Sequence, residues 1–437
     1  MPSVLFLTFG CKLNQAETAQ LNHLFTSEGY ELARSAAQAD VVVVNTCTVT
    51  GRSASKCRQA IHRTVRENPR AVLIAAGCYA QVNAEELAAC PGVDYILGTD
   101  EKYRIFDFLN DLEKKKTPCI QISRDFPKQA RTGTACFPGH TRSFIKIQDG
   151  CDRACSYCIV PHARGPVRSV PLHAVQKQAR YFSARGVKEI VLTGVHIGDY
   201  GKDRDGQSHL PELLDCLADT PVRIRLSSLN IEDLTDALFT RLEKHPRICR
   251  HLHIPLQSGS DTILQTMRRS YTAREFREAV LRIQDRLGPI GLGTDIIAGF
   301  PGETDDLFME TLNFCRSLPF TYMHVFPYSR RPGTEAAAMK ETVSPAIRRE
   351  RARRLRLLGE EKSSLFQRSM PGRTVEVLFE KQTAPHRFNG LSSEYLRVEV
   401  SGEGLHNALR TVVVEECENT VLKGRLVGGP AEPGCGP

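Results

Sequence analysis

Short apolar runs alternate with helical stretches over the first 113 residues of the chain. The apolar runs predict strands at residues 4–8, 41–45, 71–76 and 94–97. The stretches between them predict helices at residues 14–26, 53–66, 84–89 and 105–112. This alternation is typical of a parallel sheet covered by helices, so we expect a Rossmann-like α/β domain over residues 1–113. The polar segment 114–140 is expected to be a linker.

The same alternation returns over residues 141–368. Strands are expected at residues 144–148, 188–193, 223–227, 251–256, 293–298 and 322–327. Helices are expected at residues 172–185, 210–218, 232–244, 261–267, 273–287 and 305–317. Six β/α units predict a partial (β/α)6 barrel, and such barrels carry their chemistry at the carboxyl ends of the strands.

A long basic helix is expected at residues 345–368, and its arginines could meet either RNA or solvent: Arg348, Arg349, Arg351, Arg353, Arg354 and Arg356. The pattern then changes to short strands, expected at residues 374–379, 395–400, 409–414 and 420–426. Residues 369–428 therefore predict a small β-barrel, a module that often binds RNA but also serves other interactions. The tail 429–437 is expected to be disordered.

The composition indicates which partners and which cellular compartment to expect. The formal charge of +8 is compatible with a nucleic-acid partner, although solvated surfaces account for such a surplus equally well. We find no apolar run near the ~20 residues that a membrane span needs, and no targeting segment. We therefore expect a cytoplasmic, reducing compartment, in which free cysteines suggest metal binding or catalysis.

Three cysteines follow the expected strand 144–148 with the spacing C-x3-C-x2-C: Cys151, Cys155 and Cys158. Three thiolates on one loop can hold three corners of a [4Fe–4S] cluster and leave the fourth iron open for a ligand. A structural zinc site usually needs four ligands, and only His162 is near enough to be the fourth. Fifteen cysteines, an odd number, argue against a disulfide framework.

A second set of cysteines follows the first three expected strands: Cys11, Cys47 and Cys78. In a parallel sheet the carboxyl ends of the strands meet at one edge, so these thiols are expected to converge on a second three-thiolate site. The simpler alternative is that cysteine is a common buried residue. The remaining cysteines of the N-terminal third fit no such pattern: Cys57, Cys90, Cys119 and Cys136.

Specific motifs extend over nearly the whole chain: Gly10-Cys11-Lys12-Leu13-Asn14 through Glu17-Thr18, Asn45-Thr46-Cys47-Thr48-Val49-Thr50, the cysteine loop 150–158, His253-Ile254-Pro255-Leu256-Gln257-Ser258-Gly259-Ser260, Gly299-Phe300-Pro301-Gly302-Glu303-Thr304 and Val325-Phe326-Pro327-Tyr328-Ser329. With these motifs the chain resembles the radical S-adenosylmethionine (SAM) methylthiotransferases. Members of that family combine an N-terminal cluster domain, a radical SAM barrel and a C-terminal TRAM domain.

Three sequence motifs resemble those of the branch that acts on N6-threonylcarbamoyladenosine in tRNA: Cys11-Lys12-Leu13-Asn14, Thr48-Val49-Thr50 and Gly194-Val195-His196-Ile197-Gly198. The isopentenyladenosine branch tends to have Gln-Met-Asn after the first cysteine. One departure from the family is Asn230, where an acidic residue is expected, and it puts a local contact in doubt.

The resemblance implies replacement of C2–H by S–CH3 on N6-threonylcarbamoyladenosine at position 37 of tRNA, 3′ of the anticodon. It implies two [4Fe–4S] clusters: an auxiliary cluster on Cys11, Cys47 and Cys78, and a SAM-binding cluster on the cysteine loop. One SAM would methylate a sulfur at the auxiliary cluster, and a second would be cleaved to the radical that activates C2. The implied partners are SAM, the tRNA anticodon stem-loop and a flavodoxin- or ferredoxin-like reductant.

Barrel geometry indicates which residues would contact SAM, because they end the expected strands: Thr193, Gly194, Ser228, Gln257, Ile297, Gly299 and Phe326. RNA contacts are expected from the C-terminal barrel, the basic helix, Arg164 and Arg168. We interpret three histidines as satisfied polar residues or substrate contacts: His196, His253 and His324.

Three alternatives remain at this point. The first is the same chemistry on isopentenyladenosine in tRNA or on an aspartate of a ribosomal protein. The second is a non-enzymatic RNA-binding protein that holds zinc in its cysteine sites. The third is a radical SAM enzyme of another function, in which the N-terminal cysteines are unused.

Overall fold

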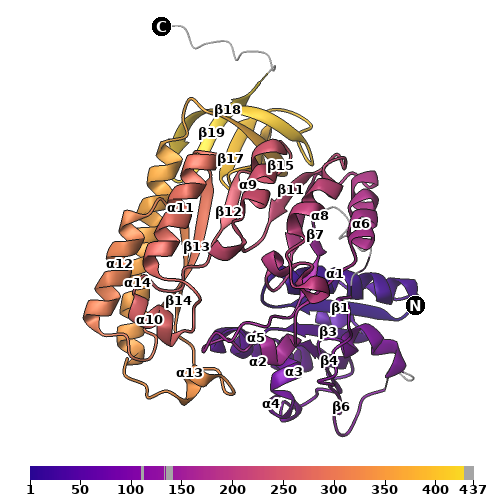
Figure 1. The fold of residues 1–437 in the computed structure, drawn as a ribbon. Helices are drawn as coiled ribbons and strands as arrows, with labels where there is room; N and C mark the ends of the chain where they lie inside the picture. Colours follow the sequence, from indigo (N-terminus) through magenta and orange to yellow (C-terminus); the bar gives the residue numbers. More distant parts are fainter. Residues whose placement is uncertain (110–112, 132, 134–140, 428–437) are drawn as a thin grey trace.

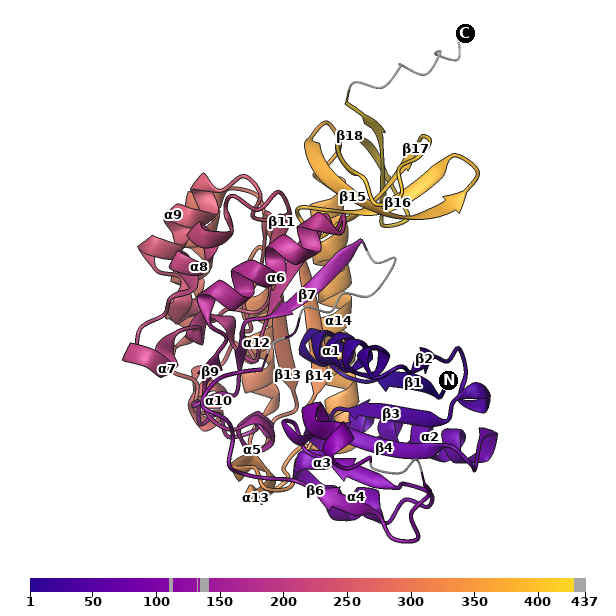
Figure 2. The same ribbon diagram turned by 90° about the vertical axis from the view of Figure 1, so that its right-hand side faces the viewer.

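The computed structural model describes residues 1–437 except 110–112, 132, 134–140 and 428–437 (Figure 1). An N-terminal α/β domain, a central barrel-like region and a C-terminal β-barrel follow one another along the chain, as Figure 2 also shows. The expected fold class is therefore confirmed. The tail predicted to be disordered lies outside the described residues. None of the described helices combines the length and apolar character that crossing a bilayer requires.

The N-terminal domain is built on a parallel six-stranded sheet of order β2-β1-β3-β4-β5-β6. Its strands are β1 (Ser3–Thr8), β2 (Glu31–Leu32), β3 (Val41–Thr46), β4 (Val72–Gly77), β5 (Tyr95–Leu97) and β6 (Cys119–Gln121). Every residue of β3 and β4 is buried, because helices cover both faces of the sheet. Alternate valines of β3 accordingly enter separate hydrophobic clusters, Val42 and Val44 on one side and Val41 and Val43 on the other.

The helices of this domain are α1 (Lys12–Ser27), α2 (Gly51–Glu67), α3 (Cys78–Val82) and α4 (Ala84–Ala88), with 3-10 turns at Ala36–Gln38 and Glu101–Asp107. Two details differ from the prediction. The segment 114–140, expected to be a linker, supplies strand β6 to the sheet. The helix expected at residues 105–112 is a 3-10 helix over Glu101–Asp107 in its described part.

The central region has six parallel strands in two three-stranded sheets, β11-β10-β7 and β12-β13-β14. These strands are β7 (Arg142–Lys146), β10 (Glu189–Thr193), β11 (Arg223–Leu226), β12 (His251–His253), β13 (Gly291–Ala298) and β14 (Tyr322–Pro327). Isolated bridges from Ile224 to Ile248 and from Ser228 to His253 connect the two sheets. The expected strand 144–148 divides into β7 and β8 (Gln148–Asp149), and β8 pairs with β9 (Arg168–Ser169) beside the cysteine loop.

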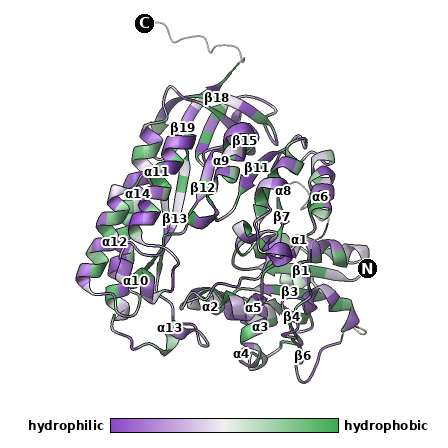
Figure 3. Ribbon diagram, in the orientation of Figure 1, coloured by the Kyte–Doolittle hydropathy of each residue, from purple (hydrophilic) through white to green (hydrophobic). Residues whose placement is uncertain are grey.

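The helices that cover these sheets are α5 (Val160–Arg164), α6 (Leu172–Ala184), α7 (Lys202–Asp205), α8 (Leu210–Leu217), α9 (Asp236–Lys244), α10 (Asp261–Thr266), α11 (Ala273–Leu287), α12 (Asp305–Ser317), α13 (Glu335–Ala338) and α14 (Pro345–Arg368), with 3-10 turns at Ile197–Asp199 and Ile231–Asp233. Helix α11 begins at a Thr272–Glu275 capping box and buries Phe276, Val280 and Ile283, which share one helical face. Figure 3 shows the matching mixture of hydrophobic and hydrophilic positions on the outer helices.

The C-terminal unit is a closed five-stranded barrel of order β15-β16-β17-β19-β18. Its strands are β15 (Thr374–Ala384), β16 (Arg387–Ser392), β17 (Arg397–Ser401), β18 (Leu409–Glu418) and β19 (Val421–Leu426). Strand β16 was not predicted, because its Asn389 and Gly390 resemble a turn. Gly390 is required where it stands, since a Cβ would lie 2.5 Å from the Leu378 carbonyl oxygen.

Buried charges fasten this barrel to the central region. Glu189 binds both Arg223 and Arg225, at 2.6 and 3.0 Å. The two guanidinium groups also donate to backbone carbonyls of the barrel, including Leu391 at 2.9 Å and Ser392 at 3.0 Å. The barrel is therefore held against the central strands by fully buried polar contacts.

Candidate active site

The first cysteine set gathers at the carboxyl edge of the N-terminal sheet. Cys11 precedes α1, Cys47 follows β3 and Cys78 begins α3 directly after β4. A Cβ on Gly10 would lie 2.7 Å from the Cys47 sulfur, so only glycine leaves room for that thiol. Burial, with a smaller contribution from the nearby Cys78 and Cys11 thiols, raises the pKa of Cys47 to about 12. Cys47 and Cys78 are buried and Cys11 is exposed. Buried thiols are costly to ionise alone and suit a shared metal cluster.

Arg164 of α5 reaches this set from the central region. Its Nε donates to the Cys78 sulfur at 3.2 Å, and its Nη1 binds Glu17 at 2.8 Å and Asp149 at 2.9 Å. Burial opposes ionisation of Glu17, yet Arg164 and two lysines hold its pKa well below the usual range. The prediction that Arg164 and Arg168 contact RNA is wrong, because both side chains are buried in ion pairs.

The second cysteine set lies on the loop between β8 and α5. The Cys158 amide donates to the Cys155 carbonyl at 3.0 Å, which folds the loop tightly. Burial and the neighbouring Cys155 and Cys151 thiols raise the pKa of Cys158 to about 12. Arg269 donates to the Cys155 sulfur at 3.4 Å and to Asn230 Oδ1 at 2.8 Å.

Asn230, the residue that departs from the family motif, therefore orients Arg269, which donates a hydrogen bond to a cysteine of the second set. Each cysteine set thus has one sulfur that accepts a hydrogen bond from a guanidinium group, Arg164 in the first and Arg269 in the second. Three thiols with a neighbouring cation fit an iron–sulfur cluster, whose thiolates carry negative charge and accept such hydrogen bonds.

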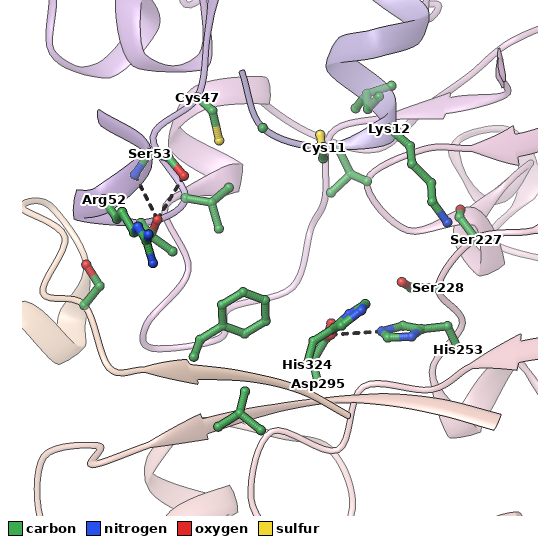
Figure 4. A pocket seen from close by; sticks show the side chains of 18 of the residues that line it. Cys11, Lys12, Cys47, Arg52, Ser53, Ser227, Ser228, His253, Asp295 and His324 are labelled. Atoms are coloured by element: carbon green, nitrogen blue, oxygen red, sulfur yellow. Dashed lines mark hydrogen bonds and ion pairs between the residues drawn. The ribbon is translucent and has the colours of Figure 1, made fainter. Parts of the chain in front are cut away.

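A cavity of about 1000 Å³ lies where the three units meet (Figure 4). Cys11 and Cys47 line it from the N-terminal domain, and Tyr395 lines it from the C-terminal barrel. The expected cofactor residues Thr193, Gly194, Ser228 and Phe326 also line it. An adjoining cavity of about 230 Å³ is lined by Cys158 together with Gln257, Ile297 and Phe326.

Two of the expected cofactor residues have unusual backbone angles. Gln257 has φ of +70°, and its backbone pairs with Asp295 and Ile297 of β13. A non-glycine residue held in this region stores strain of the kind found at functional sites. Gly299 lies outside both linings, and a Cβ there would meet Arg348 at 2.4 Å. A contact between Gly299 and SAM stays a prediction.

Histidines and carboxylates form two compact groups near the cysteines. His253 and His324 both contact Asp295 Oδ1, at 3.0 and 3.2 Å, inside the large cavity. His196 lies between Asp199 and Asp233, at 2.6 Å from each. All three histidines have polar partners, which agrees with the first of their two predicted roles, and a contact with substrate stays a prediction. Asp295 was not predicted, although an acidic residue near the end of an otherwise apolar strand is the signal that could have found it.

Family models match two parts of the chain. Residues 3–98 match the Uncharacterized protein family UPF0004, and residues 145–315 match the Radical SAM superfamily. The second match contains the C-x3-C-x2-C loop, so this chain is a radical SAM protein with SAM and a [4Fe–4S] cluster as its cofactors.

Full-length relatives narrow the assignment. The threonylcarbamoyladenosine tRNA methylthiotransferase MtaB of Bacillus subtilis is 37% identical over 92% of this chain and 91% of its own. The chain belongs to the radical SAM methylthiotransferases. The Thermotoga maritima protein of the same name is 34% identical over 98% of this chain and 99% of its own. A tRNA-2-methylthio-N(6)-dimethylallyladenosine synthase of Fusobacterium nucleatum is 31% identical over 98% of this chain and 100% of its own.

Among solved structures, the radical S-adenosylmethionine methyltransferase TsrM from Kitasatospora setae is similar in fold. It has a TM-score of 0.54 and 16% identity, and the match covers 77% of each chain. Membership of the methylthiotransferase family contradicts the alternative of a non-enzymatic zinc protein. The choice of substrate within the family is a separate question.

Proposed function

We propose that this protein replaces C2–H of N6-threonylcarbamoyladenosine at position 37 of tRNA by S–CH3. The observation that carries the proposal is the shared cavity, which places residues of the first cysteine set opposite the mouth of the radical SAM region. Two relatives that are 37% identical to this chain bear this activity in their names, and the motif Cys11-Lys12-Leu13-Asn14 supports the same branch.

The six cysteines would hold two [4Fe–4S] clusters, with Cys11, Cys47 and Cys78 on the auxiliary one. When bound, the clusters and SAM supply the radical and sulfur chemistry that amino-acid side chains lack. Arg164 and Arg269 would stabilise the thiolates through the hydrogen bonds already described. The small cavity beside Cys158 would hold SAM against Gln257, Ile297 and Phe326.

The large cavity would receive the flipped-out base. Recognition of RNA loops relies on bases that leave the stack and pack against aromatic or arginine side chains. Phe326 is an exposed ring on the cavity wall, and Tyr395 lines the same cavity from the barrel unit. Arg52 and Lys56 lie at the exposed rim, where they would meet the phosphates of the anticodon stem-loop. A flavodoxin- or ferredoxin-like protein would supply electrons.

Nucleoside mass spectrometry of tRNA tests the proposal in cells that lack the protein, with and without the chain restored. We expect the 2-methylthio form of N6-threonylcarbamoyladenosine to disappear and then return. A response of the 2-methylthio dimethylallyl nucleoside instead would assign the protein to the other branch, represented here by the Fusobacterium nucleatum relative.

The auxiliary site has its own test. Restoring the gene with Cys47→Ala should give no 2-methylthio nucleoside, because the substitution removes a ligand of the auxiliary cluster. Cys90→Ala, a buried cysteine on the same domain but outside the set, is the matched control and should restore the product. Activity of the Cys47→Ala variant would mean that the N-terminal cysteines are unused.

A further inference from the structure

The large cavity has a strongly cationic wall. The described residues that line it include four basic side chains, Lys12, Arg52, Lys56 and Arg356, but a single carboxylate, Asp295. That carboxylate is already engaged by His253 and His324. A wall with surplus positive charge and no free carboxylate favours an anionic ligand.

Lys12 differs from the other cations in its position. Arg52 and Lys56 are exposed, and Arg356 donates to the Val325 carbonyl at 2.9 Å. Lys12 is half-buried beneath the C-terminal barrel, with its Nζ 5.8 Å from the centre of the Tyr395 ring. Figure 4 shows its ammonium group directed into the cavity beside Ser227. It makes no ion pair or hydrogen bond within the described part of the chain, and the carboxylates of Glu189 and Asp295 act on its charge only from a longer distance.

Chain position places Lys12 next to the first cysteine set, and Lys12, Cys11 and Cys47 line the same cavity. Lys12 directly follows Cys11, a member of the first cysteine set. In adenosine, C2 and the carbon that bears N6 are separated by N1 alone. When C2 faces the sulfur held at Cys11, Cys47 and Cys78, the N6 substituent must therefore lie close by. On N6-threonylcarbamoyladenosine that substituent ends in a carboxylate.

We propose that Lys12 forms a specificity subsite that binds the carboxylate of the threonylcarbamoyl group. An ammonium–carboxylate hydrogen bond in a partly dry cavity is among the stronger polar contacts that proteins make. A dimethylallyl substituent offers no anion and would leave the Lys12 ammonium unpaired, which disfavours that substrate. This subsite rests on the proposed function, because it names the group on the substrate that the cavity reads.

The test measures equilibrium binding of two anticodon stem-loops to the reconstituted protein. One carries N6-threonylcarbamoyladenosine, and the other carries its amide, in which the carboxylate is replaced by a carboxamide. We expect wild type to prefer the acid by roughly 10- to 100-fold, the range of a charged hydrogen bond. Equal affinity of wild type for the two stem-loops would overturn the subsite without any mutation.

Three variants locate the contact. Lys12→Met should abolish the preference for the acid, whereas Lys12→Arg should keep most of it because the charge remains. Lys56→Met is the matched control, a lysine on the same cavity wall, and should weaken binding of both stem-loops by the same factor. If Lys12→Met acts like Lys56→Met, Lys12 binds phosphate and the proposal is wrong. Iron content, measured on each variant, shows whether the neighbouring Cys11 site is still assembled.

Turnover of the threonylcarbamoyl stem-loop, and of a third stem-loop that carries dimethylallyladenosine, separates failure of the subsite from failure of the proposed function. Wild type that methylthiolates the dimethylallyl stem-loop and not the threonylcarbamoyl one would contradict the proposed function and the subsite together. Wild type that modifies the threonylcarbamoyl stem-loop, with Lys12→Met keeping its preference for the acid, would contradict the subsite alone.

Discussion

At the scale of single residues, Arg164 connects the two halves of the site through its contacts with Cys78, Glu17 and Asp149. Arg164→Gln leaves buried carboxylates short of a cation, so we expect the free energy of unfolding to fall by about 3–5 kcal/mol. Loss of a hydrogen bond to a ligating sulfur should also lower the reduction potential of the auxiliary cluster. Chemical denaturation and a potentiometric titration measure the two effects.

Arg168→Gln is the matched control, because Arg168 is also buried and binds Asp100 but contacts no cysteine sulfur. It should lower stability and leave the potential unchanged. The titration is done with the second cysteine set replaced by alanine, so that one cluster contributes. Equal shifts in potential for the two variants would mean that the N–H···S bond has no special role.

Sequence alone predicted the six cysteines but not the partners that surround them. Cysteine spacing is local, whereas Arg164 meets Glu17 across 147 positions, and no pattern in the sequence indicates that pairing. For this reason Arg164 was wrongly predicted to contact RNA. Asp295 and Lys12 were missed as cavity residues for the same reason, since only the fold brings them together.

At the scale of elements, the turn between β1 and α1 is shaped to admit the Cys47 sulfur. Gly10 has φ of +100°, and a Cβ there would lie 2.7 Å from that sulfur. Gly10→Ala should therefore displace Cys47, and iron should fall from about eight to about four atoms per chain. Gly29→Ala is the control, because Gly29 also has a positive φ, of +83°, but nothing lies within 4 Å of its added Cβ.

Iron and protein assays on the two reconstituted variants measure how many iron atoms each chain keeps. Gly29→Ala should keep its iron and lose about 1–2 kcal/mol from backbone strain alone. Full iron occupancy in Gly10→Ala would show that the first set tolerates a shifted Cys47 and that steric fit at this turn is unimportant.

The long periodic elements were predicted, and several of the short ones were not. Helix α11 has both a capping box and a buried stripe, so its predicted bounds are those observed. Strands β2 and β6 have two and three residues, too few to show any periodicity, and pairing with a neighbouring strand defines them. Strand β16 contains Gly390 because the Leu378 carbonyl of the neighbouring strand approaches it closely. In the sequence, a glycine required by such a tertiary contact looks the same as a glycine required by a turn.

At the scale of the whole molecule, Glu189 fastens the C-terminal barrel by neutralising Arg223 and Arg225. Glu189→Gln leaves two buried guanidinium groups without their carboxylate, so we expect a loss of about 3–5 kcal/mol. Hydrogen exchange should increase in β16 and the loop after it. Glu376→Gln is the control, because Glu376 is exposed and lies 3.7 Å from Arg223, and it should cost less than about 1 kcal/mol.

The pKa of Glu189 predicts that the free energy of unfolding depends on pH. Burial alone would raise the pKa of Glu189, but Arg225 and Arg223 lower it from 4.5 to about 2. Its contribution of about 3 kcal/mol is complete above about pH 4.5 and is lost as the pH falls toward 2. Denaturation of cluster-free protein should show a smaller decline in acid for Glu189→Gln than for wild type. Parallel declines would assign the acid sensitivity to other groups.

The cavity takes its lining from residues as far apart as Gly10 and Tyr395. During translation both cysteine sets leave the ribosome well before Tyr395 does, because a nascent chain emerges from its N-terminus. The growing polypeptide thus displays all six of these cysteines while the cavity beside them still lacks the wall that Tyr395 provides. Only after strands β15 to β19 have emerged can the barrel unit dock and enclose the space in which a reactive intermediate would be handled.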